Sequence, residues 1–114
     1  GLDAIGDYVH AGDVARGIAA LLTCPAPRHP VYNIAQGEAV SLRDLLARVA
    51  EIDPALRIVE APPEEADLVG DPTLMGGRWG AYDISRIAAE TGWRPRPLAD
   101  GLRDYRDWLR DHPV

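Results

Sequence analysis

The sequence predicts an α/β fold in which about four helices are joined by three short strands. Apolar residues recur at helical spacing in four segments, and each segment has a capping, glycine or proline residue where a helix begins or ends. Three short stretches between them, residues 8–10, 31–34 and 57–60, carry mostly β-branched, aromatic or other apolar residues typical of strands. A length of 114 residues suits one domain, and we expect a single domain over residues 1–114.

The composition excludes several classes of protein. With 12 basic and 18 acidic residues the formal charge is −6, which argues against a nucleic-acid partner. No apolar run approaches the roughly 20 residues of a membrane span. No signal peptide opens the sequence, so we expect a cytoplasmic protein with no membrane partner. The single cysteine, Cys24, excludes an internal disulfide.

Lysine is absent, and all basic residues are arginines. A lysine Schiff base, a P-loop lysine and a lysine that lowers a tyrosine pKa are therefore excluded within this chain. The sequence begins with Gly1, and its one methionine is Met75. Trimming of a complete protein and derivation from a longer protein both explain this start, and both stay open.

The first helix is expected over residues 14–22. Residues 8–10 read as a short extended piece, and Asp13 is expected to cap the helix that follows. Pro25 ends this helix, and the proline-rich residues 25–30 form a loop.

A second strand and helix follow this loop. Residues 31–34 are expected to form the strand, with a turn at Gly37. Ser41 is expected to cap a helix whose apolar face runs from Leu42 to Val49, with Asp44 in the capping-box position.

The last part of the chain predicts two more helices. Residues 57–60 are the third strand candidate, and residues 62–80 show no clear periodicity. Asp83 is expected to cap a short helix that ends at Gly92, because glycine readily adopts the left-handed conformation of a helix end. A final amphipathic helix is expected over residues 98–109.

Four motifs occur in a fixed order along nearly the whole chain. They are Asp-Tyr-Val-His-Ala-Gly-Asp-Val-Ala at 7–15, Val-Tyr-Asn-Ile at 31–34 with Gly37 and Ser41-Leu42, Asp-Ile-Ser-Arg at 83–86 leading to Thr-Gly-Trp-Arg-Pro at 91–95, and Gly-Leu at 101–102 followed by Trp108. In this order they resemble the C-terminal portion of the extended short-chain dehydrogenase/reductase family, the NAD-dependent epimerases and dehydratases.

The resemblance implies a Rossmann-type NAD(P) domain followed by a smaller substrate lobe, acting on sugars that are usually linked to a nucleoside diphosphate. The family's Gly-x-x-Gly-x-x-Gly turn and Tyr-x-x-x-Lys pair are both missing here, and Arg86, four residues after Tyr82, does not replace the lysine. We therefore expect no catalytic and no cofactor-binding residue in this chain, which is inactive alone. NAD or NADP is expected in the parent enzyme, on an upstream cofactor domain.

Three residues are expected to contact substrate. Many nucleotide-sugar members carry diphosphate-binding arginines at two positions that hold Gly6 and Thr73 here. Arg78 lies near the second position and can serve instead, because arginine suits bidentate phosphate recognition. Trp79 lies beside it in the same irregular stretch. Gln36 follows the second expected strand, where ligands of open α/β sheets tend to bind.

Other polar and aromatic residues are expected to be structural. Asp7, His10 and Asp13 are three residues apart, but a metal site is less favoured than hydrogen bonding, because they span a strand and a helix cap. Trp93 and Trp108 are expected to be packing residues.

The cysteine and the two remaining histidines are given no functional role. Cys24 is expected to be a small buried hydrophobe, and His29 and His112 are expected to face solvent.

These expectations describe the substrate-binding C-terminal part of an NAD(P)-dependent sugar or nucleotide-sugar epimerase, dehydratase or reductase. Its partners are a sugar-like small molecule and its own upstream cofactor domain, and a homodimer stays open. The alternative is a stand-alone small-molecule binding or regulatory module derived from that lobe. A domain whose helices merely pack against a partner is a third reading.

Overall fold

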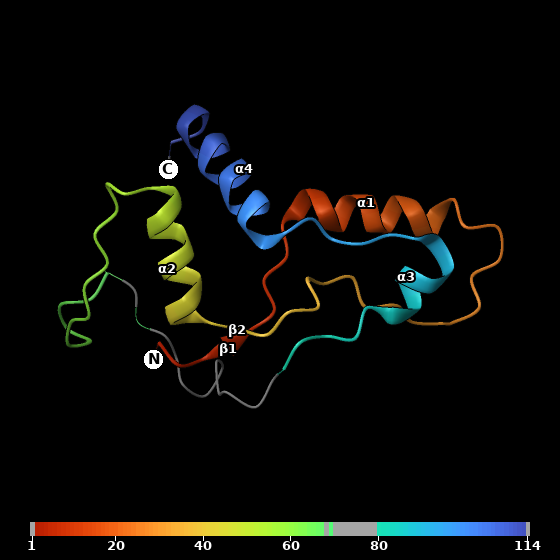
Figure 1. Cartoon of the computed structure of the whole chain (residues 1–114), viewed down its shortest axis with the longest axis horizontal. Helices are drawn as coiled ribbons and strands as arrows, with labels where there is room; N and C mark the ends of the chain where they lie inside the picture. The colour runs from red at the N-terminus through yellow and green to blue at the C-terminus, as the bar shows by residue number, and fades with distance from the viewer. Residues whose placement is uncertain (1, 68, 70–79, 114) are drawn as a thin grey trace. The chain divides into compact units, whose positions relative to one another are not determined.

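The computed structural model describes residues 2–67, 69 and 80–113. Within them the chain forms four helices and a two-stranded sheet (Figure 1). The elements are β1 (Ile5–Gly6), α1 (Ala11–Leu22), β2 (Val40–Ser41), α2 (Leu42–Ile52), α3 (Ser85–Thr91) and α4 (Leu98–Asp111). The α/β class and the four helices are confirmed. None of the described helices has the length and apolar character that a membrane crossing needs.

The chain divides into two compact units, which we call the sheet unit (residues 1–6 and 39–80) and the helical unit (residues 7–38 and 81–114). In the sheet unit, β1 and β2 pair antiparallel, with Ile5 opposite Ser41. The Leu42 N–H continues this pairing by donating to the Ala4 carbonyl at 2.9 Å. α2 begins directly after β2, and the Ser41 hydroxyl accepts from the Asp44 N–H at 3.1 Å. The predicted serine cap is therefore confirmed.

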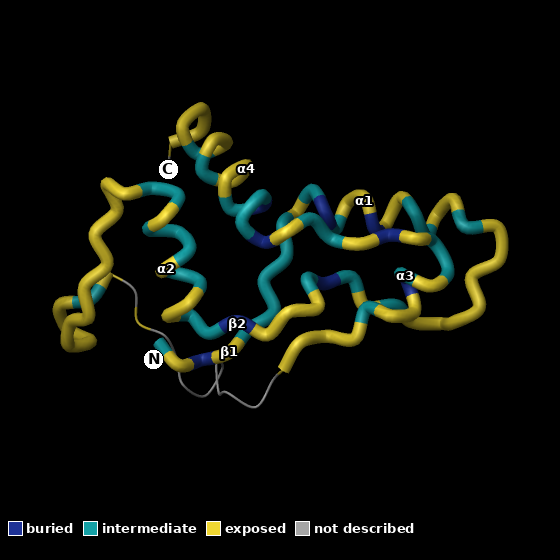
Figure 2. The backbone as a smooth tube through the Cα atoms, in the orientation of Figure 1, coloured by how far each residue is buried: buried dark blue, intermediate teal, exposed yellow. Residues whose placement is uncertain are grey.

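The core of the helical unit lies where α1 packs on α3 (Figure 2). Ile87 of α3 is fully buried, and Trp93, just after α3, is 7% exposed. Gly17 of α1 allows this close packing, since a Cβ there would lie 2.8 Å from the Ile34 side chain and 3.2 Å from Trp93. The indole N–H of Trp93 donates to the Asp13 carbonyl at 3.2 Å and ties the chain after α3 to α1.

The three predicted strands do not form in the structure. The paired strands are β1 and β2, whereas residues 8–10, 31–34 and 57–60 have no strand partner in the described chain. A β-branched segment becomes a strand only when a neighbouring backbone completes its hydrogen bonds. In the segment 31–34 the Val31 carbonyl accepts a hydrogen bond from the Arg86 side chain, at 3.3 Å, and not from a neighbouring strand.

The beginning of α1 also differs from the prediction. His10 caps the helix, with its Nδ1 accepting from the Gly12 N–H at 3.1 Å, so the helix starts at Ala11. Asp13 is therefore not the cap: it lies inside the first turn, where it is 1% exposed. Its carboxylate forms ion pairs with Arg16 and Arg96.

At α3 the predicted C-terminal end is confirmed and the predicted N-cap is wrong; of the two tryptophans predicted to pack, one is buried. The N-cap position is Ile84, and the Asp83 carboxylate accepts from the N–H of the first helical residue, Ser85, at 2.8 Å. Gly92 ends α3 with φ +73°, as predicted. Trp93 is a core residue, as predicted, but Trp108 is 51% exposed and stacks only on its helix neighbours.

Candidate functional site

The carboxylate of Asp7 joins two distant segments of the helical unit. Its Oδ1 accepts from the Gln36 N–H at 2.7 Å, and its Oδ2 accepts from the N–H groups of Gly37 and Tyr82, both at 3.0 Å. Tyr82 lies three residues after Trp79 in the sequence. Asp7 therefore ties the turn that holds Gln36 to the segment that follows Arg78 and Trp79 in the sequence. These three are the predicted substrate residues.

Gln36 is held at both its backbone and its side chain. The side-chain amide donates to the Arg96 carbonyl at 2.8 Å, in addition to the backbone bond to Asp7. Gly37 then turns the chain with φ +72°, and a Cβ there would lie 3.1 Å from the Ile84 side chain. The turn is thus fixed in place, and contact of Gln36 with a ligand stays a prediction.

Arg78 and Trp79 lie outside the described residues. Their predicted role in binding substrate stays a prediction.

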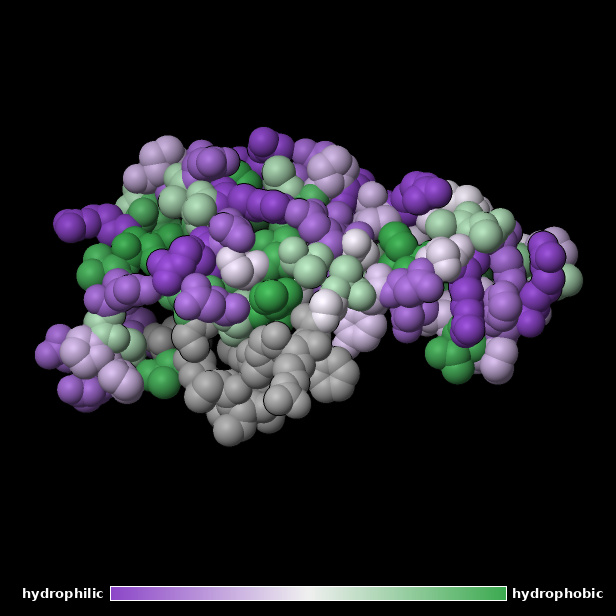
Figure 3. All heavy atoms as spheres, turned by 60° about the horizontal axis from the view of Figure 1, so that its bottom comes forward, coloured by the Kyte–Doolittle hydropathy of each residue, from purple (hydrophilic) through white to green (hydrophobic). Residues whose placement is uncertain are grey.

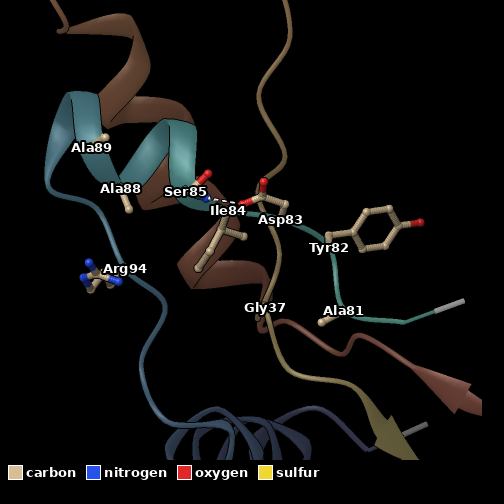
Figure 4. Close-up of a pocket in the computed structure, with 9 residues that line it drawn as sticks. All are labelled: Gly37, Ala81, Tyr82, Asp83, Ile84, Ser85, Ala88, Ala89 and Arg94. Atoms are coloured by element: carbon tan, nitrogen blue, oxygen red, sulfur yellow. Dashed lines mark hydrogen bonds between the residues drawn. The ribbon is translucent and has the colours of Figure 1, made fainter.

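A pocket of about 550 Å³ lies beside the Gln36 turn (Figure 4). It is lined by Gly37, by residues 81–85, by one face of α3 and by Arg94. Figure 4 shows Arg94 on the side of the pocket away from Tyr82, whose ring points outward. The Ser85 N–H holds the pKa of Asp83 below its ordinary value.

Arg94 is the residue of this pocket that sequence reasoning missed. Its side chain is exposed and lines the pocket, and a guanidinium can bind a carboxylate or phosphate. The available signal was an arginine between Trp93 and Pro95, directly after the glycine that ends α3. That position predicts that the Arg94 side chain is exposed, but it does not predict that the side chain lines a pocket.

Asp13, whose side chain is 1% exposed, pairs with Arg96 in the helical unit. The Asp13 carboxylate accepts from the backbone N–H and the Nε of Arg96, at 3.3 and 3.2 Å, and also pairs with Arg16. Burial alone raises the pKa of Asp13, but hydrogen bonds from Arg96 and Arg16 outweigh it, and the pKa is lowered. Arg96 also pairs with Asp104 at 2.5 Å, linking α1 to α4.

The three residues weighed as metal ligands are each engaged by other groups of the chain. Asp7 binds backbone amides, and His10 caps α1. Arg96 contacts both the His10 ring and the Asp13 carboxylate. Among the described residues, no three histidine, cysteine or acidic side chains gather in a way that could hold a metal ion. Their arrangement is that of structural hydrogen bonding.

A second polar cluster ties the loop after α1 to α3. The Tyr32 hydroxyl donates to Glu90 at 2.5 Å, and the Arg28 N–H donates to the same carboxylate oxygen at 3.1 Å. The bond from Tyr32 is the main reason that the pKa of Glu90 is lowered. His29 is exposed, as predicted, and its Nε2 lies 3.5 Å from the second Glu90 oxygen.

Two curated proteins are similar to nearly all of this chain. The dTDP-4-dehydro-6-deoxy-D-allose reductase of a Streptomyces species is 28% identical over 105 residues, or 92% of this chain. The enzyme of the same name from Streptomyces bikiniensis is 26% identical over an equal length. This chain spans only 29% of the length of either relative. No protein-family model matches the chain.

Solved structures agree with the chain over 97% of its length. RMD from Pseudomonas aeruginosa, complexed with NADPH, matches with a TM-score of 0.71 at 22% identity, which concerns the fold alone. The Bordetella bronchiseptica enzyme WbmF, in complex with NAD⁺ and UDP, matches with a TM-score of 0.68 at 28% identity. The chain covers 34% and 31% of these two structures.

The chain therefore resembles, in sequence and in fold, the C-terminal portion of the extended short-chain dehydrogenases/reductases, as its motifs predict. The proteins similar in sequence are named dTDP-4-dehydro-6-deoxy-D-allose reductases, and the similar structures were solved with NAD⁺, NADH or NADPH.

The N-termini of α1 and α2 are already bonded within the chain and offer no free site for an NAD(P) phosphate. A dinucleotide phosphate is typically held at the N-terminus of a helix. Here side chains of the protein itself take the first amides: His10 at α1 and Ser41 at α2. The chain also has no lysine for a Tyr-x-x-x-Lys pair.

Proposed function

We propose that the chain is the C-terminal, substrate-side part of an NAD(P)-dependent nucleotide-sugar reductase, epimerase or dehydratase. The main support is the 28% identity to a dTDP-sugar reductase over 92% of the chain. The chain's own part is to bind and orient the substrate. Hydride transfer and the acid/base step belong to the NAD(P) domain of a longer polypeptide.

The substrate site of this proposal comprises Arg78, Trp79 and Gln36. Its support is the Asp7 carboxylate, which binds the backbone of the Gln36 turn and of Tyr82. The similar WbmF structure was solved with UDP as well as NAD⁺. In this site Arg78 binds the diphosphate, since a guanidinium donates two parallel hydrogen bonds to phosphate oxygens.

The test compares Arg78→Gln with Arg94→Gln in the longer polypeptide, with UDP and dTDP as probes in titration calorimetry. Arg78→Gln is expected to weaken nucleotide binding by roughly 10- to 100-fold, as hydrogen bonds to a charged group are lost. Arg94→Gln removes the same charge from the pocket beside α3 and is expected to leave binding within about twofold of the unchanged protein.

Each other outcome contradicts part of the proposal. A loss with Arg94→Gln alone would place the nucleotide in the pocket beside α3. No binding of either nucleotide by the unchanged protein would contradict a nucleotide-sugar substrate. Binding by the 114-residue chain alone, as tight as by the longer polypeptide, would favour a stand-alone binding module.

A further inference from the structure

Glu90 of α3 is a buried carboxylate, with a side chain only 6% exposed. It differs in this from the hydrophilic side chains that are spread over the surface in Figure 3. Its Oε2 accepts from the Tyr32 hydroxyl and from the Arg28 N–H. Its Oε1 is buried and has no hydrogen-bond partner in the described part of the chain. An unpaired buried carboxylate oxygen is costly, so it calls for an explanation.

The imidazole of His29 faces this unpaired oxygen. Its Nε2 lies 3.5 Å from Glu90 Oε1, within reach of an ion pair but without a hydrogen bond. Tyr32 fixes the ring in this place, because the His29 N–H donates to the Tyr32 hydroxyl at 3.0 Å and the two rings meet edge to face with centroids 5.9 Å apart. The His29 side chain is 42% exposed, so it exchanges protons with solvent.

The other charged groups around Glu90 keep their charge between about pH 5 and pH 8. They are Arg28 and Tyr32 of the same loop, while Arg86 of α3 donates to a carbonyl of the segment that follows. Burial and the Glu90 carboxylate raise the pKa of Tyr32, which stays protonated. The Tyr32 hydrogen bond is the main cause that lowers the pKa of Glu90, and the charges of His29 and Arg28 lower it further. Glu90 is therefore ionised over this range, and His29 is the member of the cluster whose charge changes.

We propose that His29 and Glu90 form a pH-sensitive latch that holds residues 25–32, the loop after α1, against α3. A neutral imidazole carries one N–H, whereas an imidazolium carries two. Protonation therefore places a charged donor at Nε2, and a small rotation of the exposed ring closes the 3.5 Å gap to a charge-assisted hydrogen bond with Oε1. Because the closed latch binds the proton more tightly than the open loop does, the latch strengthens as the pH falls from about 8 to about 5.5. The loop continues into the Gln36 turn, but the latch does not depend on the proposed function.

The test is a double-mutant cycle of His29→Gln and Glu90→Gln in the 114-residue chain, with thermal unfolding measured at about pH 8 and about pH 5.5. At the lower pH, His29→Gln is expected to lower the Tm by about 2–5 °C when Glu90 is present, and by about 1 °C or less in the Glu90→Gln background. At the higher pH its effect is expected to be about 1 °C or less in both backgrounds. His112→Gln is the matched control, because His112 is exposed and stacks on Trp108, and its effect is expected to be the same in both backgrounds.

A loss of Tm with His29→Gln that is equal at the two pH values, or that persists unchanged in the Glu90→Gln background, would overturn the latch. If Glu90→Gln fails to fold, amide hydrogen exchange decides, since the Arg28 and His29 amides donate to Glu90 and Tyr32. In the unchanged chain their protection, corrected for the intrinsic effect of pH on exchange, is expected to be roughly threefold to tenfold greater at the lower pH. In His29→Gln it is expected to be the same at both pH values. Protection that does not change with pH in the unchanged chain would contradict the proposal.

Discussion

Trp93→Ala is expected to lower the free energy of unfolding by about 3–5 kcal/mol. The indole is 7% exposed, lies against Gly17, and donates a hydrogen bond to the Asp13 carbonyl. Its removal leaves a cavity between α1 and the chain after α3, together with an unpaired carbonyl. The measurement is urea unfolding of the chain, followed by the circular dichroism of its helices.

Trp108→Ala is the matched control, because it removes the same side chain from an exposed position. Trp108 is 51% exposed and stacks only on Tyr105 and His112 of the same helix end. We expect it to cost about 1 kcal/mol or less. Equal losses for the two variants would contradict the core described for the helical unit.

Asp13→Asn is expected to destabilise the chain by about 2–3 kcal/mol, below the usual cost of breaking a fully buried pair, because Arg96 is 35% exposed. The change keeps the shape of the side chain but removes its charge from Arg96 and Arg16. Asp100→Asn, which breaks an exposed pair with Arg103, is expected to change stability by about 0.5 kcal/mol or less. Urea unfolding at neutral pH compares the two variants.

The pH dependence of stability tests the same pair. Because the pKa of Asp13 in the folded chain lies below its ordinary value of 3.8, its stabilisation is complete above that value. It is lost as the pH falls through the lower, folded-state pKa. The stability difference between the unchanged chain and Asp13→Asn should therefore shrink below about pH 4. A difference that is constant from neutral pH down to the acid transition would contradict the charged pair.

The helices could be predicted because their signals are local. Ser41 bonds to an amide three residues away, and Gly92 adopts a left-handed conformation that it favours intrinsically. The strands could not be predicted in the same way. Ile5–Gly6 becomes a strand because Val40–Ser41 lies beside it, and a two-residue pairing leaves no periodic pattern in either segment.

The polar interactions, too, could be predicted only where the two partners lie close together in the sequence. The sequence predicts Asp13 at a helix cap because aspartate often occupies one, while its actual partner, Arg96, lies 83 residues further along. The Asp7 carboxylate likewise bonds to amides 29 to 75 residues away. Such long-range partners leave no spacing to recognise. The sequence points to Gln36 because ligands gather where strands end, but residues 31–34 form no strand, and Gln36 lies instead in a turn that Asp7 fixes.

The most direct test of the proposed function is native mass spectrometry of the intact protein from its source cells. The account predicts a polypeptide roughly three times the mass of this 12.4 kDa chain or more, as in relatives of which the chain spans 29%, with a dinucleotide of the NAD(P) class bound. A polypeptide near 12.4 kDa, or a longer one that binds neither NAD nor NADP, would contradict it.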